Sequence, residues 1–385
     1  MRNFFLTVTI LAVTLATYGQ PMSRDAAALV VRGDSCMLMN DTYNSMLCYE
    51  QANQLCRNDT VMHKLAQCYF KRGQYVKCLT LTDSLMADTV LYQHIKLRYN
   101  CLQKMDADDS LRIDCAQRLV SINPMDAAVV ADIATYYNGK QQADTALSYC
   151  QAYYCIDSTN QQINKQMGRA FFIKKDYYRA LDLFLEAYNN GDENPATLFY
   201  IGRTYECCNI PEKAHDFMLM AAEKSMFASL PVVKALARVS NTFSHRDEVL
   251  EYTQKGFELC QADSASMAEL YEIRANFYRA YRITYRDDSV KREQCTKNCI
   301  KMLKNSLEYK SSASAMFELA TLYRETNELA QEKYWLQKIM EWPRDKSTRD
   351  HIRYAEWRLK QIEEEKFFKD GKKPDGGIEF VEVED

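Results

Sequence analysis

The feature that most constrains this chain is a spacing of about 34 residues between similar segments. Ala66, Asn100, Ala134, Gly168 and Gly202 occupy the same position in five successive copies. In four of these copies an aromatic residue follows three positions later. Twelve, sixteen and nineteen positions after the reference residue, the same four copies carry mostly small or apolar residues. A repeat of this length predicts a stack of helix pairs, because one pair alone cannot bury its apolar face.

The best-preserved copy, "MGRAFFIKKDYYRALDLFLEAY", shows why the sizes alternate. A small residue, Gly168, lets the second helix cross the first closely, and Phe171 fills the space beside it on the same face. On the second helix, Ala180 is the matching small position and Phe184 the large one. The residues that we expect to pack between helices are Gly168, Phe171, Ala180, Phe184, Ala187, Gly202, Tyr205 and Ala214.

The period and the residue sizes at these offsets resemble the tetratricopeptide repeat (TPR). Additional copies surround Gly33, Ala237, Ala275 and Ala320, and the copy at Asn100 is degenerate. The resemblance implies an all-α fold, a right-handed α-solenoid of stacked antiparallel helix pairs with about eight TPR-like repeats. The segment "STRDHIRYAEWRLKQIEEEKFF" is predicted to be the more polar helix that caps such a stack.

The two ends of the chain differ from the repeats. Residues 1–19 combine a basic Arg2 with the apolar run "FFLTVTILAVTLA", which is too short for a bilayer span of about 20 residues. We interpret residues 1–19 as a secretory signal peptide cleaved before Gln20; a buried first helix is the alternative. The repeat domain is predicted over 20–365, and 366–385 as a flexible acidic tail, with a short edge strand as the alternative.

Composition limits the partners and the compartment. A net charge of −3 gives no footprint for nucleic-acid binding, and no other segment is apolar enough to be transmembrane. Because residues 1–19 are interpreted as a signal peptide, we expect secretion across the inner membrane of a Gram-negative bacterium, into the periplasm or cell envelope. Surface association is one option. The 14 cysteines are mostly scattered singly in helical patterns, as packing residues are. The sequence leaves open whether one or two disulfides join adjacent helices.

The sequence holds no catalytic motif. The five histidines lie far apart along the chain, and neither an HExxH nor a CxxC pattern occurs. Cys295 and Cys299 lie one helical turn apart, and we interpret them as a structural pair rather than metal ligands. The sequence therefore predicts no enzyme activity, no cofactor and no metal site.

The TPR resemblance implies that ligands lie along the concave face formed by the first helices. The facing positions lie three before, one after and four after the small reference residue of each copy. Among them is a basic run with aromatic neighbours, made of Lys165, Arg169, Phe172, Phe199, Arg203, Lys234 and Arg238. Such a run suits a protein or peptide that carries acidic groups. The alternative is that these cations are solvated or paired within the chain.

From these features we predict a non-enzymatic scaffold or adaptor for protein binding. The alternatives are an envelope or outer-membrane assembly factor and a glycan-binding protein of a polysaccharide-uptake system. A recurring Asp-Ser or Asp-Thr pattern also resembles the acceptor motif of bacterial O-glycosylation, with turn and cap chemistry as the alternative. Its hydroxyl residues are Thr60, Ser84, Thr89, Ser110, Thr145, Ser158, Ser264 and Ser289.

Overall fold

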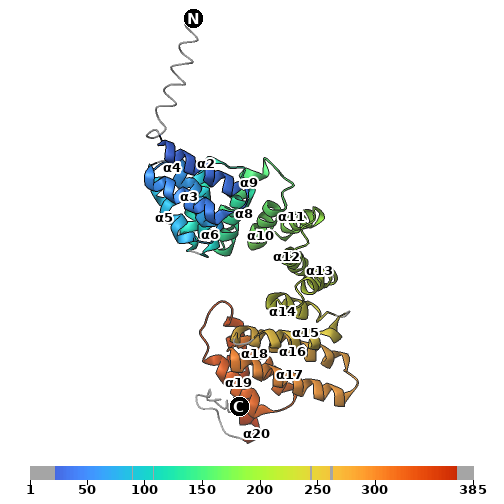
Figure 1. Ribbon diagram of the computed structural model, residues 1–385. Helices are drawn as coiled ribbons and strands as arrows, with labels where there is room; N and C mark the ends of the chain where they lie inside the picture. Colours follow the sequence, from blue (N-terminus) through green and yellow to red (C-terminus); the bar gives the residue numbers. More distant parts are fainter. Residues whose placement is uncertain (1–21, 89, 107, 243–244, 261–262, 371–385) are drawn as a thin grey trace, which may run out of the picture. The chain divides into compact units, whose positions relative to one another are not determined.

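The computed structural model describes residues 22–88, 90–106, 108–242, 245–260 and 263–370, without the side chains of residues 88 and 366–370. Every regular element in these ranges is a helix, which confirms the predicted all-α fold (Figure 1). The predicted signal peptide 1–19, Thr89 and residues 371–385 of the predicted tail lie outside the described residues.

The chain divides between Asp192 and Glu193 into two compact units, and each is described by itself. Unit 1 contains α2 (Arg24–Leu38), α3 (Thr42–Leu55), α4 (Asp59–Lys71), α5 (Tyr75–Asp88), α6 (Tyr92–Lys104), α7 (Asp109–Ile122), α8 (Ala127–Gly139), α9 (Ala143–Tyr154), α10 (Gln161–Ile173) and α11 (Tyr177–Asn189). Unit 2 contains α12 (Pro195–Cys207), α13 (Pro211–Lys224), α14 (Leu230–Val239), the 3₁₀ turn η1 (Arg246–Glu248), α15 (Val249–Leu259), α16 (Ser264–Thr284), α17 (Ser289–Tyr309), α18 (Ala313–Glu325), α19 (Leu329–Met340) and α20 (Arg349–Asp370).

Within the described residues these helices form nine consecutive pairs followed by α20, one pair more than the expected number of about eight. Even the degenerate copy around Asn100 forms a complete pair, α6 and α7. The last helix packs on α19 through Ile352, Ala355 and Ile362, which share a buried cluster with Leu336. α20 ends at Asp370, beyond the boundary that we expected at 365.

The turn inside most pairs has one repeated backbone conformation. The seventh residue after the small reference position has a positive φ at Asn40, Gly73, Gln141, Lys175, Asn209 and Asn327. In the pair α10–α11 the next residue, Asp176, donates its backbone N–H to Phe171 O at 3.0 Å, which closes the end of α10. The Asp176 carboxylate also accepts from the backbone N–H of Arg179 and caps α11. Asp176 thus closes the end of α10 with its backbone and caps the start of α11 with its side chain, so the two helices reverse direction with very few linking residues.

The close crossing of paired helices is visible where glycine is the small residue. A Cβ on Gly168 would lie 2.8 Å from Cε1 of the Phe184 ring, and Phe184 is fully buried. Tyr49 occupies the same place against Gly33, as Met218 does against Gly202, and the offset along the chain is the same each time. Because contacts below 3.0 Å are not tolerated, the helices could not approach this closely with alanine at these positions.

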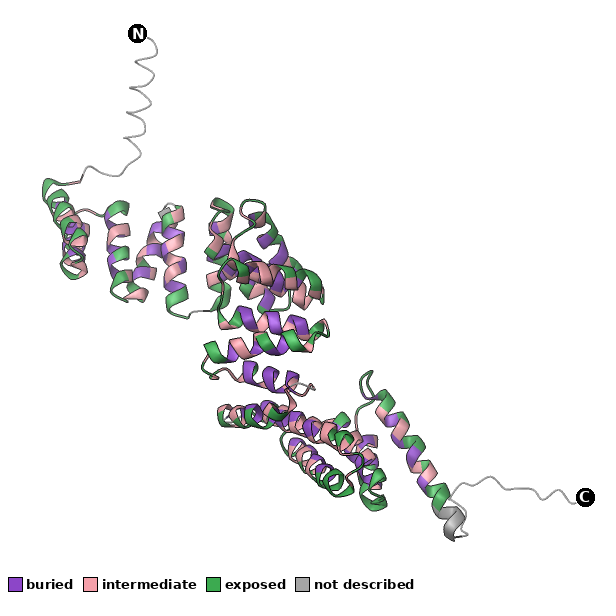
Figure 2. Ribbon diagram, turned by 90° about the vertical axis from the view of Figure 1, so that its right-hand side faces the viewer, coloured by how far each residue is buried: buried purple, intermediate pink, exposed green. Residues whose placement is uncertain are grey.

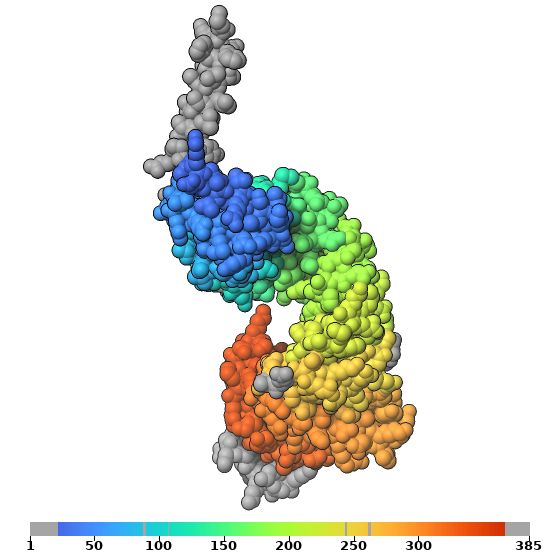
Figure 3. All heavy atoms as spheres, viewed as in Figure 1, coloured from blue at the N-terminus to red at the C-terminus, as the bar shows by residue number. Residues whose placement is uncertain are grey.

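The other predicted packing residues lie around this contact. Ala180, Ala187 and Ala214 are fully buried and Tyr205 is nearly so. Phe171 is only half-buried, with the guanidinium of Arg179 5.7 Å from its ring centroid. The burial pattern agrees with a stack: buried residues line the contacts between neighbouring helices, and side chains fill the spaces between the ribbons within each unit (Figures 2 and 3).

The pair α16–α17 differs from the sequence-based expectation. In the sequence, the charged stretch between Arg282 and Gln294 lies between the apolar pattern around Ala275 and the segment "CIKMLKNSLEY", which predicts a second helix that begins late. Instead, both helices extend into the charged stretch and reach 21 residues each. Asp288 makes this possible because its carboxylate caps α17 by accepting from the backbone N–H of Lys291.

All 14 cysteines lie in the described residues and have free thiols, so no disulfide joins adjacent helices there. Nine of them are buried, including Cys299, whose Sγ lies 3.4 Å from Ala275 O. None of the helices in the described part of the chain is long and apolar enough to span a membrane.

We predict that Gly168→Ala lowers the free energy of unfolding by about 1–3 kcal/mol, because the added methyl group overpacks the contact with Phe184. The shift of the urea midpoint measures this effect. Gly139→Ala is the matched control: Gly139 ends α8, is exposed, and has no atom within 4 Å of the added Cβ. It should leave stability unchanged or raise it slightly. Equal destabilisation by both variants would contradict the close-crossing explanation.

Candidate functional site

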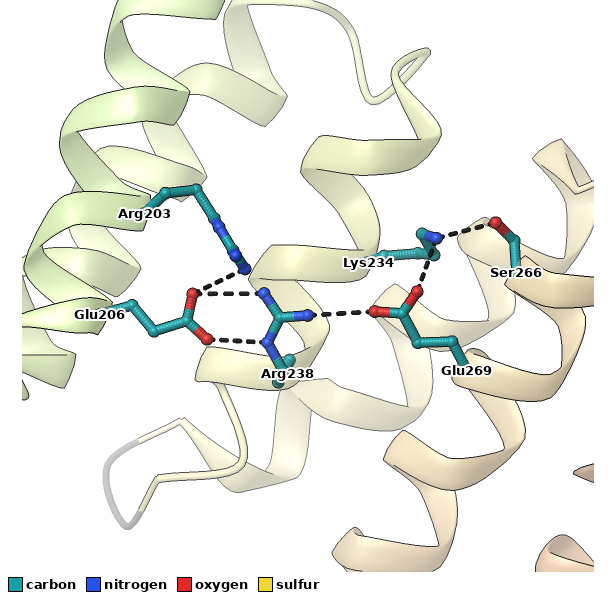
Figure 4. A network of polar contacts seen from close by, with 6 residues as sticks. All are labelled: Arg203, Glu206, Lys234, Arg238, Ser266 and Glu269. Carbon is teal, nitrogen blue, oxygen red and sulfur yellow. Dashed lines mark hydrogen bonds and ion pairs between the residues drawn. The ribbon is translucent and has the colours of Figure 1, made fainter. Parts of the chain in front are cut away.

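The first helices of three consecutive pairs in unit 2 carry one connected network of charges (Figure 4). At its centre, Arg238 of α14 donates from Nε to Glu206 Oε1 at 2.7 Å and from Nη1 to Glu269 Oε1 at 3.0 Å. Lys234 donates to Glu269 Oε2 at 2.7 Å, and Arg203 donates to Glu206 Oε2 at 3.0 Å. Charge-assisted bonds therefore link α12, α14 and α16 along one face.

The network is partly shielded from water. The side chains of Arg238 and Glu269 are 36% exposed, and that of Glu206 is 25% exposed. Burial raises the pKa of the Glu206 carboxyl, although Arg203 lowers it, and the nearby charge of Glu269 raises it further. Three cations meet two carboxylates here, which leaves one positive charge in excess. Arg203, Lys234 and Arg238 are thus paired within the chain, not a row of unpaired cations.

The remaining predicted site residues have partners of other kinds. In unit 1, Lys165 Nζ lies 3.1 Å from Asp192 Oδ2, and Arg169 Nη1 donates to Gln166 Oε1 at 3.2 Å. The Phe172 ring packs edge-on against Tyr177 with centroids 5.5 Å apart. In unit 2, the Phe199 ring packs in the same way against its neighbour Tyr200, with centroids 5.8 Å apart. The structure thus connects Arg203, Lys234 and Arg238 in unit 2, while Lys165, Arg169 and Phe172 belong to unit 1.

A hollow of about 580 Å³ adjoins the charge network on α14 and α16. Its lining residues are Arg238, Asn241, Glu269, Glu272, Ile273, Asn276, Arg279, Ala280 and Ile283.

Two carboxamides stand out in this lining. Asn241 donates from Nδ2 to Ile273 O at 3.1 Å, while its Oδ1 is buried and has no hydrogen-bond partner in the described residues. The carboxamide of Asn276 also lacks a partner among these residues.

The charges around the hollow are nearly balanced. Arg279 donates to Glu318 Oε1 at 2.6 Å, and Glu272 accepts from the hydroxyl of Ser306 at 3.3 Å. Burial raises the pKa of the Glu272 carboxyl; the Ser306 hydrogen bond lowers it, and the charge of Glu318 raises it. The hollow therefore offers amide groups and paired charges beside an apolar surface, on which Ile283 is 75% exposed.

Sequence analysis did not identify the acidic partners of the network. Glu206 and Glu269 lie 32 and 31 residues from Arg238, so a shift of about one repeat separates each pair. A search for opposite charges one repeat apart at the facing positions would have found Glu206, four residues after Gly202, but not Glu269, which lies six residues before Ala275. A search limited to neighbouring turns of one helix finds Glu206 beside Arg203, but it misses the bonds of Arg238, because these join different helices.

The structure places the Asp-Ser and Asp-Thr motifs mainly at helix starts and turns. Asp263 and Asp288 cap α16 and α17, directly before Ser264 and Ser289. Thr60, Ser110, Ser158, Ser264 and Ser289 are exposed, whereas Ser84 and Thr145 are half-buried. Asp263 and Asp288 thus have a capping role that requires no modification, and glycosylation of the eight hydroxyl residues stays a prediction.

No protein-family model matches the chain, and no curated protein matches it. Solved structures with similar folds include the APC/C hetero-tetramer Cut9–Hcn1, at 13% identity and a TM-score of 0.48, covering 88% of this chain and 77% of that one. A tetratricopeptide repeat protein from Parabacteroides merdae matches at 10% identity and a TM-score of 0.45, covering 64% and 98%. YrrB, a TPR protein with an unusual peptide-binding site, matches at 16% identity and a TM-score of 0.41, covering 51% and 93%.

The TPR character of the fold is visible in the chain itself. Helix pairs make up both units, the period of about 34 residues runs from Ala66 to Gly202, and the small-to-large contact at one fixed offset occurs in each unit. The described residues thus form stacks of TPR-type helix pairs.

Proposed function

We propose that the chain is a non-enzymatic scaffold or adaptor that binds an extended segment of a partner protein. The proposed binding site is the hollow beside α14 and α16 in unit 2. The observation that carries this proposal is the pair of carboxamides, Asn241 and Asn276, that line a hollow of about 580 Å³.

A peptide backbone is the ligand that these carboxamides suit best. Each carboxamide offers a donor and an acceptor, and each residue of an extended peptide presents one N–H and one C=O group. The buried Oδ1 of Asn241 has no partner in the described residues, which costs about 1–3 kcal/mol; a backbone N–H of a ligand would remove that cost once the carboxamide turns toward the hollow. Ile273, Ala280 and Ile283 add apolar surface for the ligand's side chains.

The charge balance modifies the partner that we expected from the sequence. Arg238 already pairs with Glu206 and Glu269, so an acidic ligand group would have to compete with two carboxylates. We therefore propose a polar segment with small apolar side chains, recognised mainly through its backbone, in place of a strongly acidic one. Added salt should weaken its binding only slightly, because few charges are neutralised.

We also propose that the protein acts in the bacterial cell envelope. This part of the proposal rests on the sequence of residues 1–19, where a basic residue, an apolar run and small residues follow in the order of a secretory signal.

We predict that Asn241→Ala combined with Asn276→Ala weakens peptide binding about tenfold, because two hydrogen bonds of about 0.7 kcal/mol each are lost. Ligands are selected from a random-peptide display library on the purified chain, and their dissociation constants are measured by fluorescence anisotropy. Circular dichroism and a melting curve verify that the variant folds.

The matched control removes two carboxamides from another surface: Gln331→Ala with Gln337→Ala, both exposed on α19. This control should bind the selected peptides like the wild type. Failure to enrich any peptide, or unchanged affinity of the double asparagine variant, would show that the hollow is not a peptide site.

For the envelope, we predict that the chain expressed in a Gram-negative host is recovered from the periplasm with Gln20 as its first residue. N-terminal peptide mass spectrometry after cell fractionation measures this. A chain that keeps residues 1–19 and stays in the cytoplasm would contradict the proposed export.

A further inference from the structure

Two histidines that are distant in the sequence meet in unit 2, one on a second helix and one in the turn before the next second helix. His215 belongs to α13, and His245 directly precedes η1 in the following pair. Their rings stack face to face, with centroids 3.6 Å apart and planes 6° from parallel. Glu248, at the end of η1, completes the group, since one ligand atom from each of the three residues lies within 4.8 Å of the others.

The unusual member of this group is His215. It is 2% exposed, and both of its ring nitrogens are buried without a hydrogen-bond partner in the described residues. Glu248 Oε2 lies 3.3 Å from His215 Nε2 but is not aligned for a hydrogen bond. Buried polar groups are nearly always satisfied, and leaving one unpaired costs about 1–3 kcal/mol. The His215 ring is therefore buried beside ligand-type side chains, and no hydrogen bond holds either of its nitrogens.

A fourth ligand-type side chain borders the group. Glu212 lies one turn before His215 on α13, and its Oε2 is 3.5 Å from His245 Nε2. Glu248 Oε1 is 3.6 Å from His245 Nδ1 on the other side of that ring. The hydroxyl of Tyr252 donates to Glu248 Oε2 at 2.9 Å, which orients this carboxylate as an outer-shell partner would. Two imidazoles and two carboxylates thus come from α13 and the turn before α15.

We propose that His215, His245 and Glu248, with Glu212 beside them, form a binding site for one divalent first-row transition metal ion, with zinc as the representative ion. Imidazole and carboxylate are ligands that this class of ion accepts. The ion would join α13 to the turn before α15 and so link two neighbouring repeats. This proposal is independent of the peptide site on the first helices.

The distances require only a local adjustment. Ligand nitrogens on a tetrahedral zinc ion are about 3.3 Å apart, because each Zn–N bond is about 2.0–2.1 Å long. The lone pairs of the stacked rings lie in two nearly parallel planes that do not meet at the site, so one ring must turn for both to reach a common ion. His245 is the one that can turn, since its side chain is 26% exposed whereas His215 is enclosed.

The test uses the mature chain, treated with chelator and kept reduced, and titrated with Co²⁺ and then Zn²⁺. We expect one ion per chain, a Co²⁺ visible spectrum typical of nitrogen and oxygen ligands, and a rise in melting temperature with Zn²⁺. His245→Ala and Glu248→Gln, both at partly exposed positions, should weaken binding about 100-fold or more and remove the melting shift.

The matched control is His351→Ala, a histidine of the same unit that packs against Phe317. It should bind the ions like the wild type. The spectrum also separates this site from the 14 thiols, because thiolate ligands give an intense charge-transfer band. Absence of stoichiometric binding, a thiolate band, or unchanged binding by both His245→Ala and Glu248→Gln would each overturn the proposal.

Discussion

The contact between a small residue on one helix and a large side chain on its partner is the interaction on which this structure depends. Phe184 against Gly168, Tyr49 against Gly33 and Met218 against Gly202 repeat it at the same offset. Such contacts let two helices cross closely and bury the large side chain completely or nearly so. Because each pair exposes a further apolar face to the next pair, the same contact also sets how the repeats stack.

A stack of this kind leaves other helix positions available for polar chemistry. On the first helices of unit 2, Arg238 bridges Glu206 and Glu269, and the hollow with Asn241 lies beside it. Between α13 and the turn before α15, His215 and its neighbours form a separate polar group with an unsatisfied buried ring. Both features join neighbouring repeats, and neither takes part in the small-to-large contacts.

The fold could be predicted from the sequence because its determinants lie within a single repeat. Gly168 and Phe184 belong to adjacent helices of one pair, so their offset is constant and recurs in each copy. The polar sites were harder to predict because their members come from different pairs. Arg238 meets Glu206 across 32 residues, and His215 meets His245 of the following pair. At such sequence distances each side chain has several possible partners, and the sequence does not show which of them it contacts. The full length of α16 and α17 was not predicted, because the charged residues between Arg282 and Gln294 suggest a break between helices. Arginine, lysine and glutamate nevertheless favour helices.

The measurement that tests the central claim most directly is a double-mutant cycle between Gly168 and Phe184. Leucine at 184 removes the ring atoms that approach an added Cβ at 168, so the two substitutions should compensate each other. The unfolding free energies of the wild type, Gly168→Ala, Phe184→Leu and the double variant should show a favourable coupling of about 1 kcal/mol or more. Additive effects, within about 0.5 kcal/mol, would contradict the claim that this contact sets the crossing of the helices.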